Sequence, residues 1–557
     1  MVGLSMKPLL PVFLLCAALV AAAALTGCGG GTMDAKEAAG KKILLVGNGA
    51  DPRFMDLHLI NSVSEHHIML ALFEGLVAEH KSKDDDVEPG VAERWETNSD
   101  KSVWTFHLRQ DARWSDGVPI TAEDFVWSWR RMLTAELAAE YSQMLFALKH
   151  GRGFYEKKLS AGEVGVKALD PRRLEVTLVG PTPHFLLMLL HTSWWPVPRH
   201  VIEKYGDPLD RVNPWTHEGN MVSNGAFKLK RNLFRQVLEV EKNPQYWDVA
   251  NVKIDGVRFY PLESDSTEER LFRRGMLHQT QIVPLDKIPS YRAKHPDIYK
   301  QDPSTSVYFY RINTSRPALK DVRVRQALAL AIDRESIVRN VTRAGQRPAG
   351  GIVPDMAGYP ASDLLKFDPG KARALLAEAG YPGGRDFPKF EILINTSEAH
   401  RAIAEVIQQM WQQHLGIRIG ILNQDFGVYL DSMTRIDYDV MRAGWNADYL
   451  DPATFIDMWT TGNGNNNTHW SNPEFDRLVA ASTQEGDGAK RFEILRKAEE
   501  IILTEVPAIP IYFYTRSRLV HPAVKEWHPK LLDNHVWKHY ELVTPPPSST
   551  MDSYWKQ

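Results

Sequence analysis

The spacing of apolar residues predicts alternating strands and helices in the later half of the chain. Apolar side chains run through residues 390–394 and recur at every second position from Ile417 to Ile421, two patterns typical of strands. Between them, residues 398–415 place apolar side chains three and four positions apart, and Gly416 follows as a stop signal. A strand, helix and strand of these lengths predict a right-handed crossover between parallel strands.

Start signals predict two more helices in this half. Asp368 is a good N-cap, and Pro369 fits the first turn of a helix that ends near Gly380. Asp321 is expected to begin another helix, which runs over residues 322–341. Leu375, Leu376 and Ala379 carry the apolar face of the first of these helices.

The earlier half shows weaker but similar patterns. Residues 43–46 form a short apolar run, and residues 104–108 alternate large apolar and polar side chains, as half-buried strands do. Thr121-Ala-Glu-Asp124 has the character of a capping box before a helix over 125–133. At 557 residues the chain exceeds one hydrophobic core. We find no repeat or low-complexity linker, so the predicted domains are interwoven.

The amino terminus has the pattern of a secretion signal. Lys7 precedes an apolar run over 9–25, which ends in Leu25-Thr26-Gly27-Cys28. This tetrapeptide resembles the bacterial lipobox, which predicts a signal peptide over 1–27, lipidation of Cys28 and a flexible leader over 28–41. Cys16 and Cys28 are the two cysteines of the chain, so the mature protein is expected to have no disulfide. An ordinary signal peptide with a chance cysteine is the alternative.

Composition and motifs exclude several classes of protein. A formal net charge of −3, without a clustered basic excess, argues against nucleic-acid binding. Gly47-Asn48-Gly49 lacks the third glycine of a dinucleotide fingerprint, and the adjacent His66 and His67 cannot chelate one metal together. The hydrolase elbow, the His-Glu-x-x-His motif and the Walker loop are missing from the sequence. We therefore expect neither an enzyme nor a cofactor or metal site.

A series of ordered motifs covers nearly the whole chain after residue 41. They include Pro89-Gly-Val-Ala-Glu-Arg-Trp95, Trp114-Ser-Asp-Gly-Val-Pro-Ile-Thr-Ala-Glu-Asp-Phe125, Asn243-Pro-Gln-Tyr-Trp247, Asp321-Val-Arg-Val-Arg-Gln-Ala-Leu328 and Arg442-Ala-Gly-Trp-Asn-Ala-Asp-Tyr449. Together they resemble the family-5 extracellular solute-binding proteins of ABC importers, and within that family the periplasmic oligopeptide-binding group.

The resemblance implies an α/β fold of the periplasmic-binding-protein type (class II-like). Two large lobes and an extra inserted domain are expected, with the ligand cleft between the lobes. Lobe I would comprise 42–73, 201–305 and 515–557, the inserted domain II would span 74–200, and lobe III would span 306–514. A peptide would lie extended in the cleft, pair like an added strand and be enclosed by hinge closure.

The same resemblance implies a function in import. The protein would be a monomer, exported across the bacterial inner membrane and lipid-anchored on the periplasmic or cell-surface side. It would capture oligopeptides and deliver them to the permease subunits of an ABC transporter. Two alternatives stay open: another ligand (a cell-wall peptide, a nickel chelate or a sugar), or a signalling or adhesion lipoprotein that feeds no transporter.

The family motifs also imply binding residues. A buried peptide terminus needs an opposite charge, and Asp448 matches the carboxylate that grips the peptide ammonium. Arg442 and His400 match positions that receive the carboxyl end. Asp448 could instead be a helix cap or surface acid, and His400 could be merely packed. Residues that match the cleft wall are Tyr141, Val63, Gly444 and Trp445.

Other positions depart from the family pattern. Positions in the cleft that are occupied differently are Asn61 (a Glu in close relatives), Thr342 (a Lys), Arg311 (a Glu), Met433 (an Arg) and Phe426 (a Trp). Arg343 is a candidate to replace the lysine, but a neighbouring helical side chain points about 100° away. Ser306 and Asn446 stand where some relatives have a disulfide. Because Arg311 reverses a charge, we hypothesise that it favours an acidic group on the ligand.

Overall fold

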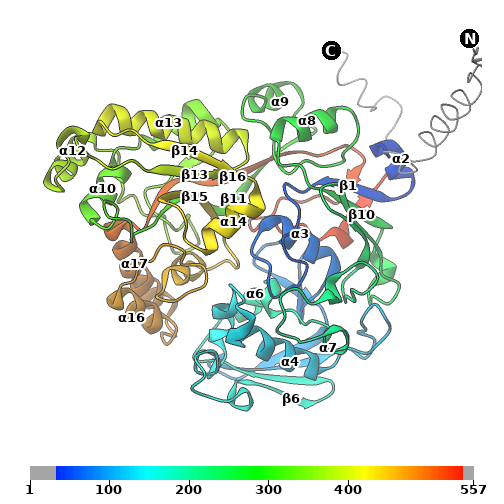
Figure 1. The fold of residues 1–557 in the computed structure, drawn as a ribbon. Coiled ribbons are helices and arrows are strands. Elements are labelled where there is room, and N and C mark those ends of the chain that lie inside the picture. The colour runs from blue at the N-terminus through cyan, green and yellow to red at the C-terminus, as the bar shows by residue number, and fades with distance from the viewer. Residues whose placement is uncertain (1–32, 544–557) are drawn as a thin grey trace, which may run out of the picture.

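The computed structural model describes residues 33–543, so the predicted signal peptide and Cys28 lie outside the described residues. Its elements form three groups, each built on its own sheet (Figure 1). The first sheet has the order β1 (Ile43–Gly47), β10 (Gly256–Tyr260), β9 (Val237–Lys242) and β8 (Phe227–Leu233), with β1 parallel to β10. Segments far apart in the sequence therefore share one sheet, which supports the expectation of interwoven domains.

The second sheet lies within the segment that separates β1 from β8. It is antiparallel, in the order β4 (Ala92–Thr97), β5 (Val103–Leu108), β7 (Arg173–Thr177) and β6 (Val166–Asp170). Helix α4 (Ala122–Met132) packs on it, and its N-cap Thr121 forms the predicted capping box with Asp124. This group is cyan at the bottom of Figure 1. The predicted strand at 104–108 is confirmed, while the helix begins three residues earlier than expected.

The third sheet is the largest. Its order is β12 (Arg347–Pro348), β16 (Ala508–Leu519), β11 (Tyr299–Ile312), β15 (Val440–Asn446), β13 (Glu391–Asn395) and β14 (Gly420–Gln424). Strands β13 and β14 are parallel and are joined by α13 (Glu398–Leu415), so the predicted crossover is confirmed. The second strand of this crossover, β14, begins at Gly420 rather than at the predicted Ile417. Ile417 and Ile419 are buried just before it.

Two long strands connect the first and third groups. The first half of β11 pairs with the end of β16, and the pairing between these two strands shifts register between Pro303 and Val307. Just beyond this pair, Val520 and Val46 both form bridges to Gln279, which joins the end of β16 to the first sheet. The chain thus passes between the two groups twice at one place, a geometry suited to a hinge.

The remaining elements are helices and two short ladders. Further helices are α3 (Val63–Leu72), α5 (Gly151–Tyr155), α6 (Phe185–Met188), α7 (Arg199–Tyr205), α8 (Asp265–Arg273), α9 (Ile288–Lys294), α12 (Pro369–Glu378), α14 (Phe426–Thr434), α15 (Ala453–Ile456), α16 (Pro473–Ser482) and α17 (Gly488–Glu505). The ladders are β2 (Val77–Glu79) with β3 (Val87–Pro89), and β17 (Val524–Lys525) with β18 (Glu541–Leu542). The helix predicted from Asp368 is confirmed as α12.

The helix predicted over 322–341 is not continuous. Its first part is helix α10 (Val322–Leu330). Asp333 then caps the short α11 (Arg334–Ser336), and a π-helical turn follows over Ile337–Thr342. The break is stabilised by the buried Arg334, whose guanidinium donates hydrogen bonds to the carbonyls of Ala329, Ile332 and Pro510. The bond to Ala329 satisfies a carbonyl group that the end of α10 leaves without a partner, and the bond to Pro510 ties the break to β16.

The expected flexible leader also differs from the structure. Residues 35–40 form helix α2, which Asp34 caps at the Glu37 amide. Ala35 and Ala38 are buried, and Met33, Ala38 and Leu45 pack in one small apolar cluster against β1. The part of the predicted leader that the structure describes, residues 33–41, is therefore packed against the fold rather than flexible.

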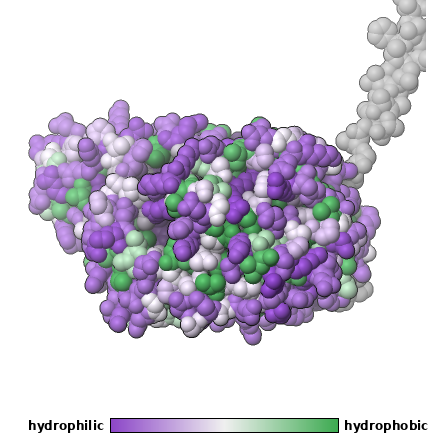
Figure 2. Space-filling view, turned by 90° about the horizontal axis from the view of Figure 1, so that it is seen from below, coloured by the Kyte–Doolittle hydropathy of each residue, from purple (hydrophilic) through white to green (hydrophobic). Residues whose placement is uncertain are grey.

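Few large apolar side chains of the described residues are exposed. On the face shown in Figure 2, hydrophilic residues predominate and hydrophobic residues occur in scattered groups. Across residues 33–543, none of the helices combines the length and apolar character that crossing a bilayer requires.

Candidate functional site

A cleft of about 230 Å³ lies between the third sheet and the loop that leads into α3. Its wall comes from segments that lie far apart in the sequence. Lining residues are Ile60, Asn61, Ser62, Val63, His66 and His67 around α3; Tyr141, His191 and Thr192; Phe426, Tyr429, Leu430 and Met433 from α14; and Arg311, Arg442–Asp448, Asn465, Tyr514, Arg516, Leu532 and Asn534. Ten of the eleven residues predicted for the site are therefore brought together.

Strand β15 presents an open edge to this cleft. β13 pairs with β15 only at Val440 and Met441, so within residues 33–543 no strand covers the edge from Arg442 onward. Residues 442–448 all line the cleft, in an unbroken run. Because successive side chains of a strand point to opposite faces, such a run means that the cleft borders the strand's edge. An extended chain could pair there.

Gly444 lies in the middle of this edge. A Cβ built there would lie 3.2 Å from the Tyr514 hydroxyl and 3.4 Å from the Val307 carbonyl oxygen. The missing side chain lets Tyr514 approach the strand closely. Trp445 covers the opposite face of β15, where its ring stacks on Tyr141 with the centroids 6.0 Å apart. The two residues predicted for the wall thus flank the same stretch of backbone.

Asp448 lies just past the end of this edge and is nearly enclosed, with 11% of its side chain exposed. The Thr454 hydroxyl donates to its carboxylate at 3.1 Å, and the Tyr141 hydroxyl lies at 3.5 Å. Burial raises the pKa of Asp448 to about 8, although these two hydrogen bonds act in the opposite direction. The carboxyl group is therefore short of a positive partner.

His191 does not supply that charge. Its Nε2 lies 3.6 Å from an Asp448 oxygen, at ion-pair distance if the ring were protonated. Burial, together with the neighbouring His66, lowers the pKa of His191 to about 3, so the ring is neutral at physiological pH. A ligand cation could fill the deficit at Asp448.

Arg442 shows the opposite imbalance at the other end of the open edge. Its guanidinium donates to the Tyr514 hydroxyl at 2.7 Å, lies 3.4 Å from the Asn395 side-chain oxygen, and sits 4.9 Å from the centroid of Tyr308. Its Nε is buried without a hydrogen-bond partner. Among residues 33–543, Arg442 forms no ion pair with a carboxylate, so a ligand anion could be accommodated.

His400 is the predicted site residue that the cleft does not include. It lies in the first turn of α13, and its ring packs 5.6 Å from the ring of Tyr308. Burial, reinforced by the charge of Arg442, lowers the pKa of His400 well below its ordinary value. A neutral imidazole behind Tyr308 matches the packed alternative rather than a group that binds a carboxylate.

The departures from the family pattern divide into two sets. Asn61 lines the cleft and donates a 2.6 Å hydrogen bond to Glu140. Arg311 lines the cleft as well, whereas Thr342 and Arg343 do not. Thr342 is buried, and Arg343 ends the π-helical turn in the left-handed region at φ 53°, not on a regular helix as expected.

Two further positions behave as the family comparison implies. Ser306 and Asn446 stand directly opposite each other in the β11–β15 ladder, so side chains at these positions are neighbours. From α14, Phe426 and Met433 both border the cleft and contribute apolar surface.

Several lining residues were not predicted. His66 and His191 stack with ring centroids 6.2 Å apart, beside Asp448. Tyr514 and Arg516 occupy alternate positions of β16. The run of three aromatic residues over 512–514 could have marked that strand, but no sequence signal places His191 near β15. No cluster of three or more His, Cys, Asp or Glu residues within 33–543 is arranged for a metal ion.

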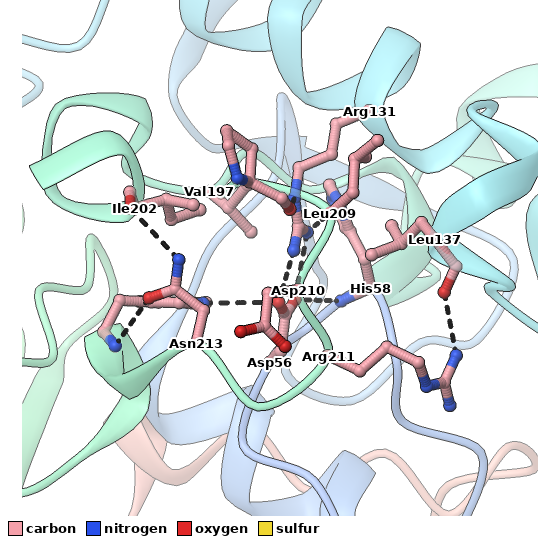
Figure 3. A network of polar contacts seen from close by, with 12 residues as sticks. Asp56, His58, Arg131, Leu137, Val197, Ile202, Leu209, Asp210, Arg211 and Asn213 are labelled. Atoms are coloured by element: carbon pink, nitrogen blue, oxygen red, sulfur yellow. Dashed lines mark hydrogen bonds and ion pairs between the residues drawn. The ribbon is translucent and has the colours of Figure 1, made fainter. Parts of the chain in front are cut away.

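A buried polar network holds the loops of the opposite wall (Figure 3). Arg131 of α4 forms an ion pair with Asp56 at 2.6 Å and contacts His58 at 3.0 Å. Nearby, Arg211 donates to the carbonyls of Leu137 and Ala138. These contacts fix the segment before Asn61 and the segment before Tyr141, so two distant parts of the chain reach the cleft together.

Direct contacts also join the two walls. Arg53 pairs with Asp431 at 2.6 Å, and Arg235 pairs with Asp425 at 3.2 Å. The ring of His184 stacks on Tyr449 with centroids 5.6 Å apart. The cleft is therefore enclosed by contacts from both sides.

Comparison with known proteins agrees with this arrangement. The periplasmic oligopeptide-binding protein OppA of Salmonella typhimurium is 36% identical over 544 residues, which cover 94% of this chain and 97% of OppA. The structure of Haemophilus influenzae OppA in complex with the peptide RPPGFSPFR has a TM-score of 0.85 and 32% identity, over 90% of this chain and 99% of that chain.

Two structures of one relative differ in their likeness to this chain. The murein tripeptide binding protein MppA of Escherichia coli gives a TM-score of 0.85 at 30% identity, over 90% of this chain and 98% of that chain. The unliganded open form of MppA gives 0.60, also at 30% identity, over 90% and 97%. Since the sequence likeness is the same, the difference lies in how the parts are arranged. The parts of this chain are not arranged as in the open form.

The family model for the middle region of the bacterial extracellular solute-binding proteins of family 5 matches residues 86–467. This region includes β15, Arg311 and α14. It carries most of the motifs that suggested the resemblance. The chain belongs to the bacterial extracellular solute-binding proteins of family 5.

Proposed function

We propose that this protein captures oligopeptides in the cleft beside β15 for import by an ABC transporter. One observation carries the proposal: the open edge of β15 runs between Arg442, a cation without an anion, and Asp448, a carboxyl group without a cation. A free peptide supplies what this arrangement lacks. Its backbone can extend the sheet, its ammonium can pair with Asp448 and its carboxylate can pair with Arg442.

The relatives support the same ligand class. One is named as an oligopeptide-binding protein and another was solved with a bound peptide. By this likeness, the protein would deliver its ligand to the permease subunits of the transporter and act as a monomer.

We further propose the division into lobe I (42–73, 201–305, 515–557), inserted domain II (74–200) and lobe III (306–514). The register shift of the β11–β16 ladder supports hinge points close to residues 305 and 514. Rotation about these two crossing strands would open and close the cleft.

Export and anchoring are part of the proposal. The lipobox-like Leu25-Thr26-Gly27-Cys28 supports cleavage before Cys28 and acylation of that residue. The test is incorporation of labelled fatty acid in bacterial cells. Cys28→Ala should abolish it, whereas Cys16→Ala should not. Labelling that persists in Cys28→Ala contradicts the anchor.

Calorimetry with short peptides tests the binding function. Unmodified peptides should bind, and either N-acetylation or Asp448→Ala should weaken binding at least a hundredfold, because each removes one partner of a buried ion pair. Asp437→Ala, at an exposed carboxylate outside the cleft, is the matched control and should bind normally. If acetylation has no effect, Asp448 does not bind the ammonium. Native mass spectrometry of the purified protein would reveal retained ligands.

A further inference from the structure

The charged side chains that line the cleft are unbalanced. Asp448 is the one carboxyl group among the described lining residues, whereas Arg311, Arg442 and Arg516 are guanidinium groups. If a peptide binds as proposed, its ammonium and carboxylate neutralise Asp448 and Arg442. Two guanidinium groups are then left facing the ligand.

Arg516 already has partners. Its Nε lies 3.7 Å from a carboxylate oxygen of Asp533, and its Nη2 donates to the Asn446 side-chain oxygen at 2.5 Å. Asp533 also pairs with Arg518, so its charge is shared. Arg516 nevertheless has a nearby countercharge from the protein itself.

Arg311 has no such countercharge from the protein. It is 3% exposed, and its Nη1 donates to the side-chain oxygen of Asn467, a neutral group. Its Nε is buried without a hydrogen-bond partner, and no ion pair involves Arg311 in the part of the chain that the structure describes. Burial lowers the pKa of Arg311, the direction expected for a cation without a countercharge.

Glu140, the carboxylate that influences Arg311 electrostatically, forms its hydrogen bonds with other residues. Glu140 has a favourable electrostatic effect on Arg311, but its carboxylate accepts hydrogen bonds from Asn61 at 2.6 Å and from Thr434 at 3.4 Å. It forms no ion pair with Arg311 at 4 Å or less. The tyrosines around Arg311 are neutral at physiological pH, so they do not replace a carboxylate.

The pairing of β11 with β15 fixes the face of the sheet on which the Arg311 side chain lies, relative to a peptide bound along β15. Arg311 stands opposite Met441, and Tyr310 stands opposite Arg442. Directly paired residues share a face, and successive residues alternate. Arg311 therefore points to the face opposite that of Arg442, and a peptide along β15 would turn alternate side chains toward it.

We propose that Arg311 forms a subsite for a carboxylate side chain, so that the preferred ligands are peptides that carry Asp or Glu. This specificity rests on the peptide-binding function proposed above. It deepens that function, since the peptide termini are bound by other residues. The physical reason is that an acidic side chain gives a buried guanidinium the charge-assisted hydrogen bonds it lacks.

The test is calorimetry with matched peptides in which Glu, Gln or Lys is placed at each position in turn. Wild-type protein should bind Glu at least tenfold more tightly than Gln at one position. Arg311→Met should bring the Glu and Gln affinities to within about twofold, and Arg311→Glu should favour Lys there. Arg477→Met, at an exposed arginine on α16, is the matched control and should keep the wild-type ratio.

Melting temperatures of the variants show whether they fold, and Arg311→Lys provides a conservative second variant that should keep part of the preference for Glu. A Glu-to-Gln ratio near one at every position in wild-type protein overturns the subsite. A tenfold ratio that survives in Arg311→Met also overturns it, and would mean that Arg311 only supports the wall. If peptides bind through their ammonium without such a preference, only the subsite is wrong. If no free peptide binds, the proposed function fails with it.

Discussion

Asp265 and Glu398 cap each other's helices where α8 meets α13. The Glu398 carboxylate accepts hydrogen bonds from the Asp265 amide at 3.0 Å and the Ser264 hydroxyl at 3.0 Å. In return, the Asp265 carboxyl group accepts from the Ala399 amide and the Ser397 hydroxyl. Two helix amino termini, one from each side of the β11–β16 crossing, therefore share two acidic groups.

This pairing predicts a stability that depends on pH. Burial, and then the nearby Glu398 charge, raises the pKa of Asp265 to about 7. Because the folded pKa lies above the ordinary value of 3.8, protonation of Asp265 stabilises the folded state fully below pH 3.8, and this stabilisation is lost progressively as pH rises from there through 7. Asp265→Asn, which keeps a neutral acceptor, should therefore be more stable than wild type at pH 8.5 by about 1–2 kcal/mol.

Chemical denaturation between pH 5 and pH 8.5 measures this difference. It should grow as pH rises from 5 to 7 and level off above pH 7. Glu268 is buried nearby with a pKa raised to about 8 by burial, so the wild-type curve alone cannot assign the effect, and the difference between the two proteins is needed. Glu335→Gln, at an exposed acid, is the control. A difference independent of pH contradicts the shared-carboxyl interpretation.

Proton release on peptide binding is the second prediction. In the unliganded cleft the pKa of Asp448 is about 8, so below pH 8 the carboxyl group holds a proton. Pairing with a peptide ammonium lowers this pKa, and binding must then release up to one proton. Affinity should fall as pH drops from 8 toward 5. Calorimetry at pH 6.5 in buffers of different ionisation enthalpy gives the number of protons released. Asp448→Asn should release none, and heats independent of the buffer in wild type exclude the mechanism.

Much of the local structure follows from the sequence because its signals are short-range. Helix α13 begins and ends as predicted, since Ser397 caps its first turn and Gly416 supplies the left-handed residue at its end. The interrupted helix after Asp321 shows the limit. Its break depends on Arg334, whose hydrogen bond to the distant Pro510 carbonyl is invisible to local periodicity.

The binding site divides along similar lines. Asp448 and Arg442 were predicted together because they belong to one motif, which covers the end of β15 and the residues just after it. His191 and Arg516 were missed because loop packing and the β11–β16 ladder, not a local pattern, bring them to the cleft. His400 was carried over from the family motif with a packed role as the alternative, and the sequence could not show that its ring lies beside Tyr308 outside the cleft.

The contact of Arg442 with a peptide carboxylate is the third prediction. Wild-type protein should bind C-amidated peptides at least tenfold more weakly than free acids, because amidation removes the charge that Arg442 would meet. Arg442→Met should bind both forms with similar, weak affinity. His400→Gln should keep the wild-type difference, since His400 lies outside the cleft. If His400→Gln rather than Arg442→Met removes the difference, the carboxyl end is bound at His400 instead.

The buried pair of Asp56 and Arg131 yields the fourth prediction. Burial alone would raise the pKa of Asp56, but the charge and hydrogen bonds of Arg131 lower it overall, so the pair is ionised at neutral pH. Arg131→Met leaves a buried carboxylate without its partner and should lower the free energy of unfolding by about 3–5 kcal/mol. Arg173→Met removes an exposed pair with Asp170 and should change the free energy of unfolding little, because water screens that pair.

Urea denaturation compares the two variants. Peptide affinity should also fall in Arg131→Met, because the loop that it fixes leads to Asn61 at the cleft wall (Figure 3). It should be unchanged in Arg173→Met, which lies away from that loop. A variant Arg131→Met that unfolds like wild type would show that the network does not support the fold. Lost stability with unchanged affinity would show that the wall of the cleft is held by other contacts, chiefly those of Arg211 with the carbonyls of Leu137 and Ala138.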